Sequence, residues 1–381
     1  TLWDIIDEMS HSLSSFVNNP DKDFLRRRKL DFEKMMRLII SMESGSMNHE
    51  LLKFFNYDFS APTSSAFYQQ RSILSLSACR HVLREFNIKF PLEKFRNKYY
   101  LIACDGSEFN IARNPKDADT FHEPNGKSAS GFNMIHTISL YEICSKRYLD
   151  LEVQPGRRKN EFQAICNLMD RYSYGGHPIV VADRGFSSYN VFAHAIENQI
   201  DFMIRAKDLN VQRFLAVNSL PDKLDTTVEL ILTRTQSKKK HKHPEKGARY
   251  RYICKNIAFD YLDPNDISDE YCLKLRIVRF EVADGIFENI ITSLSKEDFT
   301  SDDIKYCYNL RWGIETFFRD LKHTIEAIHF HSKKTEFVTL ELWSRLILYD
   351  FCSIIILYVP IQHKDRKYEY QVNFSLAMKI C

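Results

Sequence analysis

The chain has 381 residues, of which 44% are hydrophobic and 27% charged, which is ordinary for a globular protein with room for two or three domains. A formal net charge of +3 does not identify a nucleic-acid partner, so local clusters of basic residues have to support that interpretation. The most apolar run, 346–361, contains Asp350 and is too short for a membrane span, and the absence of GxGxxG and Walker A patterns argues against a nucleotide cofactor.

Residues 1–95 are predicted to be helical. Apolar residues in 24–42 recur at helical spacing without Gly or Pro, and 61–86 opens with a Pro, Ser and Thr cluster suited to capping. The basic side chains here are Arg26, Arg27, Arg28, Lys29, Arg71 and Arg80. They fit either a solvated charged face or a small helical DNA-binding unit.

Residues 96–207 alternate between strand and helix patterns. Three strands come first, in 98–111, 131–143 and 147–155, and then helix 159–172, strand 177–183, helix 188–199 and strand 200–208. This order predicts an α/β fold, with a mixed sheet flanked by helices.

Residues 208–297 have strand composition and form a β-rich block. The expected strands are 226–235, 249–262, 271–282 and 285–294. Between the first two lies a basic loop with His241 and His243, where no Cys or carboxylate follows at metal-ligand spacing, so a loop that touches DNA is favoured over a metal site. Residues 298–381 return to helix, in 300–322 and 335–358.

The nine cysteines form no CxxC pair, and several lie in apolar runs, which indicates buried free thiols in a reducing cytoplasm. Cys104 next to Asp105 could be a nucleophile, but strand alternation favours a core thiol. The chain begins at Thr1 without a methionine and ends after an apolar stretch, which suggests a fragment.

Three carboxylates are candidates for one site. Asp105 and Asp183 each follow an apolar strand, and they converge if the two strands are neighbours; Glu315 on a late helix supplies a third. Taken singly, each aspartate fits a turn or a helix cap, and Glu315 fits a helix surface. Together they suit two Mg²⁺ or Mn²⁺ ions, the arrangement used for in-line attack on a phosphodiester.

The stretch "YNLRWGIETFFRDLK" places Arg311, Glu315 and Lys322 at offsets of 3, 7 and 14 from Tyr308. On one continuous helix these four lie on nearly one face, opposite an apolar side of Leu310, Ile314, Phe317, Phe318 and Leu321. A stripe of this kind is typical of an active-site wall.

These motifs resemble the insertion-sequence-four family of bacterial DDE transposases. The spacing of Tyr308, Arg311, Glu315 and Lys322 matches the Y-R-E-K signature in full, while "ACDGSEFN" and "DRGF" resemble the two aspartate motifs. The resemblance covers residues 20–358 and implies an RNase H-like core in 96–207 and 298–381, a β-rich insertion in 208–297, and DNA-end binding by 1–95.

The resemblance also implies roles for single residues. Asp105, Asp183 and Glu315 are expected to bind the metals. Tyr308, Arg311 and Lys322 are expected to contact DNA near the cut phosphate. The basic side chains Arg184, Arg205 and Lys207 near the same edge either join them, are ordinary surface charge, or pair with the acidic cluster. The implied activity is metal-dependent cleavage of transposon ends and strand transfer into target double-stranded DNA, by a homodimer in the bacterial cytoplasm.

Two points remain open from the sequence. Some relatives stack a flipped base on a tryptophan of the insertion, but the tryptophans here are Trp3, Trp312 and Trp343, all outside 208–297. The alternatives to a transposase are an RNase H-like nuclease without strand transfer and a catalytically silent DNA-binding protein from a mobile element.

Overall fold

The computed structural model describes residues 1–26, 28–126, 128–236, 250–266, 268–323, 329–359, 372–373, 376–377 and 380. It divides into two compact units. Unit 1 comprises Thr1–Glu93, Gly106–Lys159 and Ile314–Cys381, and unit 2 comprises Lys94–Asp105 and Asn160–Gly313.

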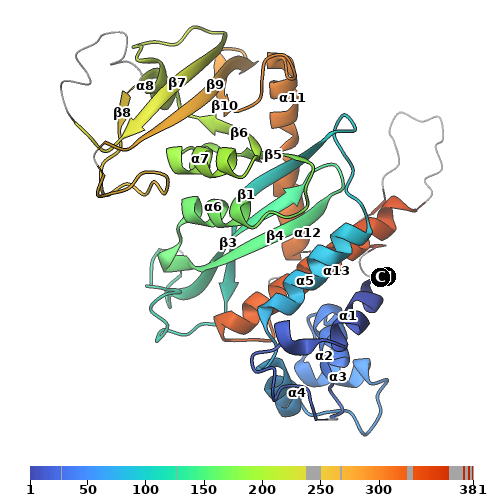
Figure 1. Cartoon of the computed structure of the whole chain (residues 1–381). Helices are drawn as coiled ribbons and strands as arrows, with labels where there is room; N and C mark the ends of the chain where they lie inside the picture. Colours follow the sequence, from blue (N-terminus) through green and yellow to red (C-terminus); the bar gives the residue numbers. More distant parts are fainter. Residues whose placement is uncertain are drawn as a thin grey trace. The chain divides into compact units, whose positions relative to one another are not determined.

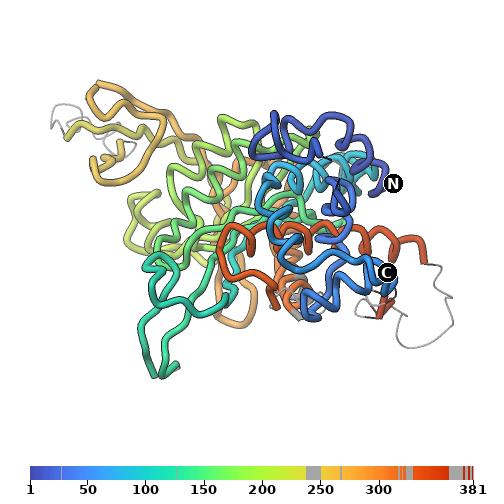
Figure 2. The backbone as a smooth tube through the Cα atoms, turned by 90° about the horizontal axis from the view of Figure 1, so that it is seen from below, coloured from blue at the N-terminus to red at the C-terminus, as the bar shows by residue number. Residues whose placement is uncertain are grey.

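Unit 1 contains a group of helices about one long helix. The helices are α1 (Leu2–Ser10), α2 (Phe32–Ser41), α3 (Met47–Phe54), α4 (Ser64–Arg71), α5 (Leu76–Lys89), α12 (Gly313–His323) and α13 (Thr335–Leu357), with the short 3₁₀ turns η1 (Leu13–Ser15) and η2 (Gly156–Arg158). α2 and α5 both pack against α13 (Figures 1 and 2). Asp31, Ser46, Thr63 and Ser75 cap α2 to α5 by accepting backbone N–H groups, which fixes where each begins.

Three strands of unit 1 form an antiparallel arrangement. β3 (Phe132–Glu142) pairs with β2 (Phe121–His122) at its first two residues and with β4 (Arg147–Pro155) from Ile135 onward. β3 is almost entirely buried, and α13 packs on β4. The apolar face of the hairpin thus forms part of the core of this unit.

Unit 2 is built on a mixed sheet. The first half of β1 (Tyr99–Ile111) pairs in parallel with β5 (His177–Ala182), which pairs in parallel with β6 (Asp201–Ala206). From β6 the sheet continues antiparallel through β10 (Ile286–Thr292), β9 (Glu270–Ala283) and β7 (Leu224–Thr233), with β8 (Tyr250–Tyr252) parallel to β7. The continuously buried apolar run of β5 is typical of a parallel strand covered on both faces.

The helices of unit 2 are α6 (Glu161–Asp170), α7 (Tyr189–Glu197), α8 (Asp208–Leu215) and α11 (Ser301–Leu310), with the 3₁₀ turn η3 (Arg184–Phe186) after β5. α6 packs against α7, and α7 packs on β6 (Figure 1). The strand and helix order predicted for 96–207 is confirmed, with the short β2 as an addition. The result is a mixed α/β protein with helices on a mixed sheet.

Several predicted elements are wrong in their limits. The predicted helix 24–42 begins only at Phe32, so Arg26, Arg28 and Lys29 of the basic run are not in a helix. The predicted helix 61–86 is two helices, α4 and α5, and the predicted strand 249–262 is a strand only at Tyr250–Tyr252. Local propensity could not place these breaks because caps and tertiary pairing set them.

The predicted continuous helix over 300–322 is also wrong. It is α11 followed by α12 (Gly313–His323), with a turn at Arg311 and Trp312. Gly313, a poor residue for a helix interior, opens the second helix, so the signature residues do not lie along one helix face.

No helix in the described parts of the chain is both long and apolar enough to cross a membrane. The histidines His241 and His243 of the predicted basic loop lie outside the described residues.

Candidate active site

Asp105 and Asp183 are brought together by strand register. Cys104 of β1 is the pairing partner of Ala182 of β5, and each aspartate is the next residue along its strand direction. Because the strands are parallel neighbours, the two carboxylates extend from the same face at the same level. The condition set by the sequence, that the two strands are neighbours, is therefore met within unit 2.

The prediction that Asp105 ends its strand is wrong. β1 continues to Ile111, so Asp105 lies near the strand's middle, where the pairing with β5 stops. Asp183 does follow the end of β5 and precedes the 3₁₀ turn η3. The side chains of Asp105 and Asp183 remain 25% and 35% exposed, so water and ions can reach both carboxylates.

Each aspartate contacts an arginine. Nη1 of Arg311 lies 3.4 Å from Oδ2 of Asp105, and Nε of Arg205 lies 3.1 Å from Oδ1 of Asp183. Nη1 of Arg205 also donates to Oε1 of Glu288 on β10, at 2.6 Å. The alternative left open for Arg205, pairing with the acidic cluster, is therefore what the structure shows.

Tyr308 does not lie on an exposed polar face. Its side chain is fully buried, and its hydroxyl has no hydrogen-bond partner among the residues that the structure describes. Burial raises the pKa of Tyr308 to about 12, against the lowering effect of Arg311 and Arg205. The phenol is therefore a neutral buried donor close to the charges on Asp183, Arg205 and Glu288.

Glu315 and Lys322 belong to α12 in unit 1. Glu315 is exposed in the first turn of that helix. The ammonium of Lys322 lies over the Phe109 ring, 5.0 Å from its centre, and burial lowers the pKa of this lysine. A half-buried lysine of this kind holds its charge in a fixed place, which favours a role in binding an anion.

The remaining predicted residues lie near the strand ends in unit 2. Arg184 in η3 and Lys207 directly after β6 are both exposed. Cys104 is fully buried, and burial followed by the Asp105 charge raises its pKa well above the ordinary value. Cys104 is therefore a core thiol, as expected from strand alternation, and not a nucleophile.

The donor chemistry of this edge fits divalent cations. Two carboxylates stand side by side, and a guanidinium cation contacts each of them, which shows that the pair attracts positive charge. Within the described residues, no group of three or more His, Cys, Asp or Glu side chains is arranged to hold a metal ion. Asp105 and Asp183 are thus two neighbouring carboxylates of unit 2 whose oxygen atoms have the chemistry of Mg²⁺ or Mn²⁺ ligands.

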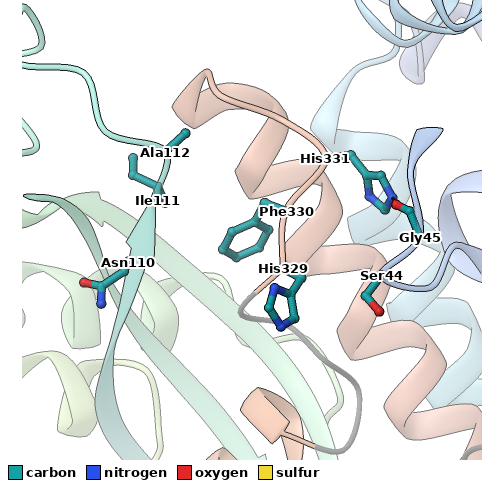
Figure 3. Close-up of a pocket in the computed structure, with 8 residues that line it drawn as sticks. All are labelled: Ser44, Gly45, Asn110, Ile111, Ala112, His329, Phe330 and His331. Carbon is teal, nitrogen blue, oxygen red and sulfur yellow. Dashed lines mark hydrogen bonds between the residues drawn. The ribbon is translucent and has the colours of Figure 1, made fainter. Parts of the chain in front are cut away.

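A cavity of about 400 Å³ lies elsewhere, within unit 1 (Figure 3). It is lined by Ser44, Gly45, Asn110, Ile111, Ala112, His329, Phe330 and His331. Nε2 of His331 lies 2.9 Å from the Gly45 carbonyl oxygen, so this imidazole joins the loop before α13 to the loop before α3. None of the described lining residues is acidic, so the lining does not suit a hard cation.

Two ion pairs escaped the sequence analysis. Glu288 was not singled out, because a lone Glu within a predicted strand carries no local signal of its ion pair with a residue on another strand. Arg71, counted among the basic residues of 1–95, is buried and paired with Glu341 at 3.1 Å. Arg71 is therefore a core ion pair of unit 1, which sequence spacing alone could not reveal.

Residues 96–351 match the family model described as "Transposase DDE domain". No curated protein matches the chain in sequence. Among solved structures, the chain is similar to the cryo-EM structure of a piggyBac transposase synaptic complex with hairpin DNA, at 11% sequence identity and a TM-score of 0.40, over 100% of this chain and 76% of that one. The assignment of this chain therefore rests on the match over 96–351.

Proposed function

The chain belongs to the transposase DDE domain family, and we propose that Asp105, Asp183 and Glu315 are the carboxylates of its active site. Membership makes it a DNA transposase, an enzyme of phosphoryl transfer. The observation that carries the proposal is the register of β1 and β5, which sets Asp105 beside Asp183. Glu315, at the position of the signature glutamate, completes the set.

We further propose that the chain belongs to the insertion-sequence-four branch, with an RNase H-like core. The support is the full spacing from Tyr308 to Lys322, together with parallel strands β1, β5 and β6 followed by the strand-rich block. The four segments 1–95, 96–207, 208–297 and 298–381 remain the proposed functional division. The proposed partners are transposon-end and target DNA, bound by a homodimer.

The carboxylates are proposed to hold two Mg²⁺ or Mn²⁺ ions. When bound, such ions activate the attacking hydroxyl and stabilise the leaving oxygen. Arg205 and Arg311 release the aspartates and turn their positive charge toward phosphate oxygens, and Lys322 contributes a further fixed charge. The expected contact of Tyr308 with the DNA backbone is proposed to form once its buried hydroxyl becomes accessible in the DNA complex. The exposed Arg184 and Lys207 extend the basic edge.

The proposed reaction has two steps of one type. Water attacks the phosphorus at the transposon end, forming a new P–O bond while the bond to the 3′-oxygen breaks, so that the strand leaves with a free 3′-hydroxyl. That hydroxyl then attacks a target phosphodiester, and the target's 3′-oxygen leaves as the new bond forms. Each step exchanges one P–O bond for another, so no ATP or covalent protein–DNA link is needed.

The test uses the full chain with DNA that carries the sequences flanking its own gene. Asp105→Asn, Asp183→Asn and Glu315→Gln are each expected to abolish Mg²⁺-dependent cleavage while DNA binding is retained. Pre-cut ends with free 3′-hydroxyls then separate a transposase from a nuclease, because only a transposase joins them to target DNA. Cleavage without joining identifies a nuclease, and binding without either reaction identifies a silent DNA-binding protein. Normal joining by any of the three variants contradicts the assignment.

A further inference from the structure

Glu288 is linked to the active-site edge through one arginine. The guanidinium of Arg205 is 2.6 Å from Oε1 of Glu288 through Nη1 and 3.1 Å from Oδ1 of Asp183 through Nε. The side chains of Glu288 and Arg205 are only 15% and 23% exposed, so this bridge is not a freely solvated surface pair. A carboxylate from the strand-rich block therefore shares a cation with a catalytic aspartate.

The sheet places these three side chains in one row. Ile204 pairs with Ala182 in the parallel β5–β6 ladder, so the next residues, Arg205 and Asp183, are also level. Arg205 pairs with Ile290 across the antiparallel β6–β10 ladder, and Glu288 lies two residues before Ile290. Because residues two apart on a strand share a face, Asp183, Arg205 and Glu288 all extend from the same face. The bridge is thus fixed by backbone register.

We propose that Glu288 is a positioning residue of the active site, which holds Arg205 so that Asp183 is free to take a divalent cation. This inference rests on the proposed function. A guanidinium and a divalent cation compete for the same carboxylate oxygen. When the contact between Nε of Arg205 and Asp183 breaks, the contact between Nη1 and Glu288 remains. The guanidinium therefore stays beside the site, facing the DNA phosphate.

Charge supports the same role. Asp183, Glu288 and Arg205 together carry a net charge of −1, which attracts a cation to the edge. Without the Glu288 carboxylate this group is neutral, and Arg205 keeps only its ion pair with Asp183. Removal of Glu288 therefore weakens the attraction of this edge for a divalent cation. It also strengthens the ion pair between Arg205 and Asp183, which competes with that cation.

The test measures Mn²⁺ binding to the full chain without DNA, by electron paramagnetic resonance of free Mn²⁺. The site is defined as the binding that Asp183→Asn abolishes. Glu288→Gln is expected to weaken this binding about tenfold or more. This is the usual loss when a residue that orients a metal ligand, without touching the metal, is removed. Glu288→Asp, which keeps the charge on a shorter side chain, is expected to give an intermediate affinity.

Asp225→Asn is the matched control. Asp225 accepts hydrogen bonds from Nε of Arg276 at 2.8 Å and from Ser301 at 2.9 Å, and so makes a similar partly buried carboxylate–arginine pair in the same block. Its loss is expected to lower the melting temperature without changing Mn²⁺ affinity. If both variants weaken Mn²⁺ binding equally, Glu288 acts through fold stability and the proposal is overturned.

The Arg205→Gln background decides whether Glu288 acts through Arg205. There, Glu288→Gln is expected to lose most of its effect on Mn²⁺ affinity, because the residue it holds is absent. An undiminished effect would show a direct charge interaction and overturn the positioning role. If the wild-type chain shows no Mn²⁺ binding that depends on Asp183, the proposed function itself is contradicted. Asp183-dependent binding with no change in Glu288→Gln refutes this inference alone.

Discussion

Asp350 in unit 1 and Asp183 in unit 2 differ in exposure and in partners. Asp350 is fully buried on α13, where it accepts hydrogen bonds from the Tyr148 backbone N–H at 2.8 Å and from Asn87 Nδ2 at 3.0 Å. Asp183 stays 35% exposed and contacts the guanidinium of Arg205. The carboxyl group of Asp350 is held by neutral donors in a closed core, and that of Asp183 by a charged guanidinium at a more exposed edge of the sheet.

The pKa values follow the same division. Burial raises the pKa of Asp350 to about 8, against the lowering effects of the Tyr148 hydrogen bond and Arg147, so this side chain is neutral at pH 7. A neutral acid in a closed core serves packing and cannot bind a cation without unfolding its surroundings. Among the described residues, the carboxyl group whose pKa is shifted most is thus structural, whereas the catalytic candidates are recognised by their geometry.

The largest expected effect is a loss of DNA cleavage on substitution of Asp183, which is not expected on substitution of Asp350. Asp183→Asn is expected to lower Mg²⁺-dependent DNA cleavage at least about a thousandfold, because a ligand of the transition-state charge is lost. Its melting temperature should stay close to that of the wild type, since Arg205 keeps Glu288 as a partner. A large drop in melting temperature would instead place Asp183 with Asp350 as a structural residue.

The reverse pattern is expected at Asp350. Asp350→Ala removes the acceptor of two buried hydrogen bonds and leaves a cavity, which should lower the free energy of unfolding by about 2–4 kcal/mol. Chemical denaturation measures the loss. Cleavage per folded molecule, assayed well below the melting temperature, should be unchanged.

The pH dependence sharpens the contrast. The pKa of Asp350 is raised in the folded chain from its ordinary value of 3.8 to about 8, so between these values the folded state holds a proton that the unfolded state has lost. The stabilisation is complete below the unfolded pKa and is lost as the pH rises toward 8. Urea unfolding of Asp350→Asn should show a flatter pH profile than the wild type over this range. Identical profiles would mean that Asp350 is ionised in the fold.

Lys322 offers a smaller effect on binding. Lys322→Met keeps an unbranched stem against Phe109 but removes the charge, which should weaken DNA binding about tenfold and lower the salt slope by about one. The exposed Lys333 provides the matched control, Lys333→Met. If both substitutions changed DNA affinity and its salt dependence equally, Lys322 would contribute only as general surface charge.

The smallest effect on stability is expected at Tyr308. Tyr308→Phe removes a buried hydroxyl that has no hydrogen-bond partner within the described part of the chain, so the free energy of unfolding should change by less than about 0.5 kcal/mol. Cleavage of DNA should still fall measurably if the hydroxyl donates to a phosphate. If the variant lost stability but cleaved DNA like the wild type, Tyr308 would be a structural core residue, as Asp350 is.

The central part of the sheet was predictable because its signals are local. Apolar runs ending near Asp105 and Asp183 marked two strands, and neighbouring parallel strands place such residues at one level. The limits of β1, predicted as 98–111, agree closely with the observed Tyr99–Ile111, but the sequence did not show that the pairing with β5 stops at Cys104, within the strand. The break at Arg311 and Trp312 was missed because helical spacing on both sides is continuous.

Long-range pairs account for the remaining differences. Glu341 neutralises Arg71 from a helix 270 residues away, and Glu288 reaches Arg205 only through the antiparallel β6–β10 pairing. The spacing of residues along the sequence predicts neither of these two contacts. Basic residues near predicted helices therefore divide into core ion pairs and exposed DNA-binding candidates only once the fold is known.

The most direct test of the catalytic edge runs wild type, Asp183→Asn and Asp350→Asn side by side, at matched concentrations of folded protein, on DNA carrying the chain's own flanking sequences. The measured quantity is Mg²⁺-dependent cleavage per folded molecule. We predict that Asp350→Asn cleaves like the wild type and that Asp183→Asn binds the DNA without cutting it. Cleavage by Asp183→Asn at the wild-type rate would contradict the account.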